Sequence, residues 1–128
     1  QYWPAIGVPE GAGVFVPLCG KSLDLHWLAG QQHPVVGVEL AEAAVRAFFA
    51  EAGLNPRLER DARWSCYVHE ALRVYCGDFM DLTARELRGV GGVYDRAALV
   101  ALPPRMREHY VDHLLRVVPD GTCILLVT

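Results

Sequence analysis

The sequence predicts an α/β protein built on a doubly wound, mostly parallel sheet. Two observations carry this prediction: short apolar runs alternate with amphipathic segments along the chain, and the runs are almost continuously apolar. Strands of that kind are typical of a parallel sheet whose two faces are both covered by helices. The chain has 128 residues, no internal repeat and no linker, so we expect a single domain over residues 1–128.

The first half of the chain predicts two strand–helix pairs. The strands are residues 14–18 and 34–39, and the helices are residues 22–30 and 42–52. Ser22 provides a cap for the first helix, because its hydroxyl can accept from a free backbone N–H. Gly53 follows the second helix at the position where glycine commonly ends a helix.

The second half begins with an expected hairpin and continues the alternation. The expected elements are strands at 64–68, 72–76, 92–96 and 122–127, a short helix near 83–87 and a longer helix over 105–118. The first two strands alternate in polarity and share a short polar link, so the second one should enter the main sheet. The longer helix carries Met106, Tyr110, Leu114 and Val118 at four-residue spacing.

Composition excludes several classes of protein. Hydrophobic residues make up 52% of the chain and charged residues 21%, which argues against disorder. No apolar run approaches the ~18 residues that a membrane-spanning helix needs, and the first residues lack the basic and apolar regions of a signal peptide. The net charge of −3, with scattered arginines, argues against nucleic-acid binding. Four cysteines without a C-x-x-C pair favour a reduced, cytoplasmic protein.

In a doubly wound sheet the ligand site lies beyond the carboxyl ends of the strands, so the residues that follow each strand are the candidates. Gly20, after the first strand, allows close approach of the backbone to a ligand; a tight turn without a ligand is an equal alternative. The sequence there is not G-x-G-x-x-G, and Phe15 stands where a P-loop needs its first glycine.

Acidic residues follow the next strands. Glu39 comes nineteen residues after Gly20, the spacing at which nucleoside-binding folds place a carboxylate on the ribose hydroxyls; a solvated glutamate is the alternative. Asp78, followed by Phe79, suits an adenine amine and ring, or else caps a turn. Asp95 and Arg96 leave an apolar strand together, and they either serve a ligand or neutralise each other.

Two further patterns are set aside. His109 and His113 stand four residues apart on the predicted long helix, but they lack the glutamate of H-E-x-x-H and a third ligand, so a solvated helix face is preferred and no metal site is expected. Cys19 has no identifiable histidine partner and is not taken as a nucleophile.

The strand-end segments together resemble those of the thiopurine S-methyltransferase family, and the bacterial branch more closely. The segments are Val-Phe-Val-Pro-Leu-Cys-Gly-Lys-Ser (14–22), Val-Gly-Val-Glu-Leu (36–40), Tyr-Cys-Gly-Asp-Phe (75–79) and Tyr-Asp-Arg-Ala-Ala-Leu-Val-Ala-Leu (94–102). The resemblance covers almost all of the chain, and it implies a class I S-adenosylmethionine-dependent methyltransferase fold that is Rossmann-like and incomplete at its C-terminal edge.

By the resemblance, the protein is an enzyme that moves a methyl group from S-adenosyl-L-methionine to aromatic or heterocyclic thiols such as thiopurines, or to selenium and tellurium oxyanions. The implied partner is therefore a small-molecule thiol, and the full-length form is expected to be a monomer. The implied cofactor contacts are Leu18, Gly20, Glu39, Asp78, Phe79 and Arg96. Arg96 is also the implied catalytic residue, between cofactor and acceptor.

The family pattern extends on both sides of this chain. Its members start further upstream and continue past the last strand with further elements of the sheet. Two alternative functions therefore stay open. Because flanking parts of the family pattern are missing, the chain can be a non-catalytic or inactive Rossmann-like fragment; because the architecture is shared, it can be a nicotinamide-dependent oxidoreductase. The missing G-x-G-x-x-G argues against the second.

Overall fold

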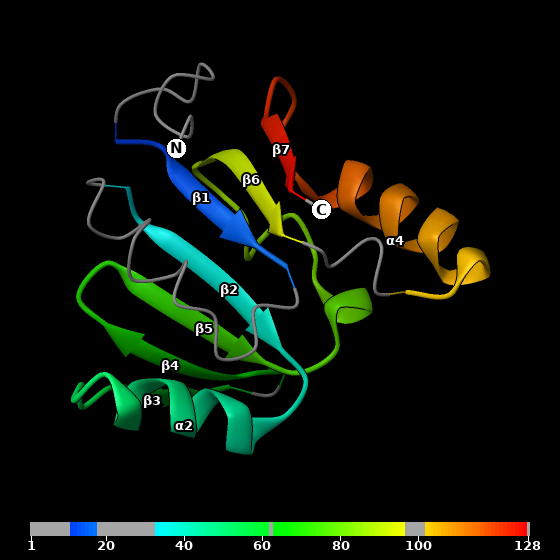
Figure 1. Ribbon diagram of the computed structural model, residues 1–128. Helices are drawn as coiled ribbons and strands as arrows, with labels where there is room; N and C mark the ends of the chain where they lie inside the picture. The colour runs from blue at the N-terminus through cyan, green and yellow to red at the C-terminus, as the bar shows by residue number, and fades with distance from the viewer. Residues whose placement is uncertain (1–10, 18–32, 62, 97–101, 128) are drawn as a thin grey trace.

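One sheet organises the computed structural model, which describes residues 11–17, 33–61, 63–96 and 102–127 (Figure 1). Within that part the sheet has seven strands in the order β3-β4-β5-β2-β1-β6-β7. The strands are β1 (Gly13–Val16), β2 (Val35–Glu39), β3 (Arg57–Arg60), β4 (Ser65–His69), β5 (Leu72–Cys76), β6 (Val90–Arg96) and β7 (Cys123–Val127). The helices are α2 (Glu42–Glu51), the 3₁₀ turn η2 (Phe79–Asp81) and α4 (Pro104–Val117).

The strand pairing explains where a ligand site can form. Strands β5, β2, β1, β6 and β7 run parallel, whereas β3 and β4 add an antiparallel extension beside β5. From β1 the chain proceeds to β2 on one side and later to β6 on the other, so the strand order reverses at β1. In such sheets the crevice beyond the carboxyl ends at the reversal is the usual ligand site.

Each face of the sheet carries its own core, because successive side chains of a strand point to opposite faces. On one face Val14 and Val16 of β1 belong to the cluster that contains Val45, Phe48 and Phe49 of α2. On the other face Phe15 belongs to the cluster that contains Tyr110, Leu114 and Val117 of α4. Figure 1 shows the two helices on opposite sides of the sheet. The predicted doubly wound arrangement is confirmed.

Most expected elements are confirmed with small shifts at their ends, and the hairpin of β4 and β5 enters the sheet as predicted. The short helix predicted near 83–87 is wrong: this segment forms hydrogen-bonded turns, in which the amides of Glu86 and Leu87 donate to the carbonyls of Thr83 and Ala84. Strand β3 was not predicted. The expected helix over 22–30 lies outside the described residues.

The buried stripe of α4 also differs from the prediction. Tyr110, Leu114 and Val117 are buried, whereas Met106 is 50% exposed and Val118, the C-cap residue, is only partly buried at the edge of the same core. A helix repeats every 3.6 residues, so a strict four-residue spacing drifts around its surface. Within the described part of the chain, no helix is long and apolar enough to cross a bilayer.

Candidate functional site

Glu39 is the last residue of β2, and one of its two carboxylate oxygens accepts a hydrogen bond from the backbone. Its Oε2 atom accepts a hydrogen bond from the amide of Ala41 at 2.8 Å, just before α2 begins. Within the described residues, Oε1 has no hydrogen-bond partner. A carboxylate oxygen is purely an acceptor, so Oε1 remains open to a donor beyond the strand end.

Asp78 has the same arrangement two residues after β5. It caps η2 by accepting from the amide of Met80 through Oδ1 at 2.8 Å. No described residue donates to its second oxygen. The two interpretations of Asp78, as a turn cap and as a ligand acceptor, are therefore compatible because each uses one oxygen.

Gly77 fixes these two acidic residues beside each other. Its amide donates to the carbonyl of Glu39 at 2.9 Å, and Glu39 pairs with Cys76 in the parallel register of β2 and β5. A Cβ atom at position 77 would lie 2.6 Å from Cζ3 of Trp64, which is closer than carbon atoms approach without strain. Only glycine lets the Trp64 ring pack against this strand end.

Phe79 is an anchor between sheet and helix. It is buried, with its ring stacked on Phe15 at a centroid distance of 6.1 Å. On its α4 side it contacts Tyr110 at 4.8 Å and the edge of His113 at 5.1 Å. The Phe79 ring therefore packs the segment that follows β5 against α4.

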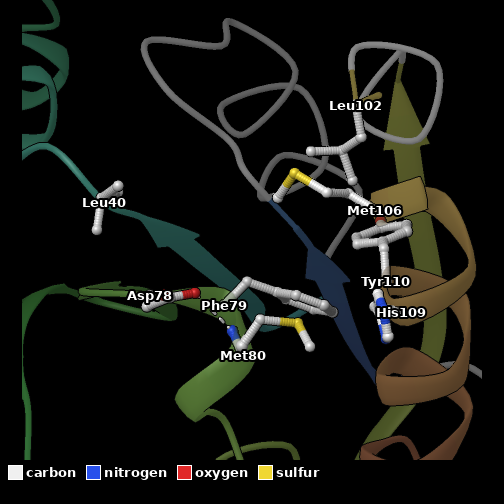
Figure 2. Close-up of a pocket in the computed structure, with 8 residues that line it drawn as sticks. All are labelled: Leu40, Asp78, Phe79, Met80, Leu102, Met106, His109 and Tyr110. Atoms are coloured by element: carbon white, nitrogen blue, oxygen red, sulfur yellow. Dashed lines mark hydrogen bonds between the residues drawn. The ribbon is translucent and has the colours of Figure 1, made fainter. Parts of the chain in front are cut away.

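A cavity of about 440 Å³ opens between η2 and α4. Figure 2 shows the side chains of η2 facing those of α4, with Leu40 at the far edge. The lining residues are mainly apolar: Leu40, Asp78, Phe79, Met80, Leu102, Met106, His109 and Tyr110. The volume lies within the ~300–1,000 Å³ of typical small-molecule sites.

Below this cavity a buried polar pair joins β6 to α4. The Tyr110 hydroxyl donates to Oδ2 of Asp95 at 2.6 Å, and Asp95 is 1% exposed. Burial raises the pKa of the Tyr110 phenol well above its usual range, and the hydrogen bond and negative charge of Asp95 raise it further. Asp95 thus has a structural partner on α4 and does not depend on Arg96 alone for compensation.

For three predicted site residues the structure describes no side-chain position. Leu18 and Gly20 lie outside the described residues. Arg96 ends β6, where its backbone pairs with Val127 of β7, but its side chain lies outside what the structure describes. Its backbone position follows Asp95 directly, at the carboxyl end of the sheet.

The two helix histidines do not share one environment. His109 is exposed, as predicted, and lines the cavity. The prediction of a solvated face is wrong for His113, whose ring packs on Phe79 and whose buried Nε2 atom has no hydrogen-bond partner among the residues that the structure describes. In the described ranges, no group of three or more His, Cys, Asp or Glu side chains is arranged to hold a metal ion.

Sequence reasoning missed part of the lining. Leu40 directly follows Glu39, which is a local signal that could have found it. Met80, Leu102 and Met106 had no such signal, because Met80 lies on η2, Met106 on α4 and Leu102 just before α4, and the packing of these segments brings them to one cavity.

This architecture is that of S-adenosylmethionine-dependent methyltransferases. A TehB-like methyltransferase from Corynebacterium glutamicum superposes with a TM-score of 0.67 at 17% identity, covering 97% of this chain and 58% of that one. The glycopeptide N-methyltransferase MtfA, solved with sinefungin, gives a TM-score of 0.69 at 20% identity, covering 98% of this chain and 50% of that one. These likenesses define the class I, Rossmann-like fold.

The family follows from the sequence comparisons: the model of the thiopurine S-methyltransferase family matches residues 1–128, and the chain belongs to that family. The thiopurine S-methyltransferase of Azotobacter vinelandii is 50% identical over 127 residues, covering 99% of this chain and 58% of that protein. That of Nitrosospira multiformis is 48% identical over the whole chain and 58% of its own length. The chain thus spans somewhat more than half the length of these relatives.

Proposed function

We propose that residues 1–128 form a single methyltransferase domain that binds S-adenosyl-L-methionine at the carboxyl ends of β1, β2, β5 and β6. We further propose that its methyl group is transferred to a small-molecule thiol, with thiopurines and other heterocyclic thiols as the acceptor class. The observation that carries the proposal is the pair of half-open carboxylates, Glu39 and Asp78, on adjacent strand ends beside an apolar cavity.

The residues of this site fit the adenosine part of that cofactor. The open oxygen of Glu39 can accept from ribose hydroxyls, and that of Asp78 can accept from the exocyclic amine of adenine. Leu40, which is 67% exposed beside Glu39, and the apolar wall formed with Phe79 offer surface for the purine ring. By family resemblance, Leu18 contacts the cofactor and Gly20 lets the backbone approach it.

Bound S-adenosyl-L-methionine supplies an electrophilic methyl group on a sulfonium centre. The chain's own contribution is positioning: its apolar cavity wall offers a surface for the ligand ring, and a nucleophilic sulfur reacts faster when it is held in line and the bound ligand displaces water. We assign Arg96 the role of holding an anionic thiolate, because a guanidinium favours the charged form of an acceptor beside it. No essential acid or base is assigned, since heteroaromatic thiols ionise near neutral pH.

Calorimetric titration of the chain with S-adenosylhomocysteine tests the cofactor part of the proposal. Glu39→Ala should weaken binding by about 1.5–3 kcal/mol, the range for hydrogen bonds to a charged group. The matched control is Glu108→Ala, which removes an exposed carboxylate of α4 that does not line the cavity. An affinity unchanged by Glu39→Ala would remove Glu39 from the site, and binding of a nicotinamide dinucleotide instead of S-adenosylhomocysteine would refute the proposed cofactor.

A further inference from the structure

Both methionines of the chain line the same cavity, although they are 26 positions apart in sequence. Met80 belongs to η2 and Met106 to α4, so the two thioethers approach the cavity from opposite walls (Figure 2). Met80 is 44% exposed and Met106 is 50% exposed. Neither side chain is part of the buried core, and about half of each residue is accessible to small reagents in solution.

From this placement we infer that Met80 and Met106 form a paired oxidation site, through which hydroperoxides lower the affinity of the cavity for its ligand. The site of modification stands on the structure alone, whereas its effect on cofactor binding rests on the proposed function.

The chemistry is a two-electron oxygen transfer. The lone pair of the thioether sulfur attacks one oxygen of hydrogen peroxide, so that an S–O bond forms as the O–O bond breaks. The departing hydroxide then takes the proton from the transferred oxygen and leaves as water. Sulfur is oxidised to the sulfoxide, and the peroxide is reduced. The product is a polar, chiral group where a flexible apolar one stood.

The surroundings explain why this change matters here. Leu40, Phe79, Leu102 and Tyr110 give the rest of the wall an apolar surface. A sulfoxide oxygen is a strong hydrogen-bond acceptor, and covering it with a ligand without providing a donor removes its hydration. Two sulfoxides on opposite walls therefore disfavour any ligand that fills the cavity with a flat apolar ring.

The experiment compares each protein before and after treatment with hydrogen peroxide. Treatment is followed by dithiothreitol, which reverses reversible cysteine oxidation but leaves methionine sulfoxide in place. Peptide mass mapping should show one added oxygen on each of the two methionine peptides. The dissociation constant for S-adenosylhomocysteine should then rise by about tenfold, and treatment with methionine sulfoxide reductases A and B should restore it.

The double variant Met80→Leu, Met106→Leu is the matched control, because leucine keeps the apolar wall and cannot form a sulfoxide. Its affinity after peroxide should equal its own affinity before peroxide. An equal loss in this variant would assign the effect to cysteine or tryptophan and overturn the inference. Unchanged affinity in a wild-type chain that carries both sulfoxides would overturn it as well.

Failure of the proposed function gives a different result. In that case the untreated chain does not bind S-adenosylhomocysteine, and mass mapping alone judges the oxidation site. Methionines in the folded chain should then react at a rate within about tenfold of those in the urea-unfolded chain, given their exposure. Strong protection in the folded chain would refute the oxidation site itself.

Discussion

Tyr110→Phe tests whether the buried pair below the cavity stabilises the fold, and the chain contains its own control for this change. Tyr110 and Tyr67 are both buried phenols whose hydroxyls donate to a carboxylate. The acceptor of Tyr110 is Asp95, which is 1% exposed. The acceptor of Tyr67 is Glu42, whose side chain is 41% exposed and also pairs with Arg46.

The difference in exposure sets the expected magnitudes. Removing the Tyr110 hydroxyl takes a donor from a carboxylate that water cannot easily reach, which should cost about 1.5–3 kcal/mol of unfolding free energy. In Tyr67→Phe, water and Arg46 can replace the lost donor at Glu42, so the cost should stay below about 1 kcal/mol.

Urea-induced unfolding of the two variants, followed by circular dichroism, measures both values. The slopes with denaturant concentration should match that of the parent chain, so that a shift of the midpoint reports stability. Equal losses in the two variants, or a larger loss for Tyr67→Phe, would refute the argument that burial of the acceptor decides the cost.

Two other predictions concern Asp78 at the edge of the cavity and the pH dependence of the unfolding free energy at alkaline pH. Asp78→Asn should raise the dissociation constant for S-adenosylhomocysteine about tenfold while changing the unfolding free energy by less than about 0.5 kcal/mol, because asparagine caps as well as aspartate but replaces the open acceptor with a donor. Calorimetry measures the first effect and urea unfolding the second. A loss of stability without a loss of affinity would show that Asp78 acts only as a cap. Burial raises the pKa of the Cys66 thiol from 9.0 to about 11. The folded state therefore holds this proton longer than the unfolded state, so stability is kept below pH 9 and falls between pH 9 and 11 by about 2 kcal/mol from this group. Cys66→Ala should flatten that part of the pH profile of unfolding, and an unchanged slope would contradict the assignment.

The fold could be predicted where a segment satisfies its own periodicity. The buried strands β1, β2 and β6 are apolar runs, and α2 ends near Gly53, whose φ of 71° is the left-handed geometry that glycine favours. The charged segment Arg57–Arg60 gave no strand signal, because β3 lies at the outer edge of the sheet and pairs with β4 through its backbone.

The error near residues 83–87 has a local cause. Glu86 accepts from the amide and the hydroxyl of Thr83 at 2.8 and 2.9 Å, which is a pairing that commonly opens a helix. Here Gly89 adopts a φ of 80° and β6 begins at Val90. The segment between Thr83 and Val90 is therefore too short for a helix and forms turns, so the tertiary structure overrides the helix-start signal.

The candidate site divides in the same way. The positions of Glu39 and Asp78 could be predicted because the apolar strand before each of them fixes where the chain leaves the sheet, whereas their role toward a ligand stays a prediction. Tyr110 and Met106 were recognised only as members of a helical stripe, since their place at the cavity depends on how α4 lies against the sheet. His113 was misassigned for the same reason: its contact with Phe79 joins two segments that are 34 residues apart.

The two acidic residues connect local structure to binding. At each of them a backbone amide, that of Ala41 or Met80, occupies one carboxylate oxygen. That bond restricts the side-chain torsions, so in the proposed cofactor site the remaining oxygen is oriented before the ligand binds, and less conformational entropy is lost on binding. The amide of Gly77 links the two positions through the carbonyl of Glu39. The turn after β2 and the cap of η2, which are ordinary features of folding, thus leave one acceptor oxygen on each of two adjacent strand ends, with Asp78 and the neighbour of Glu39, Leu40, lining one cavity.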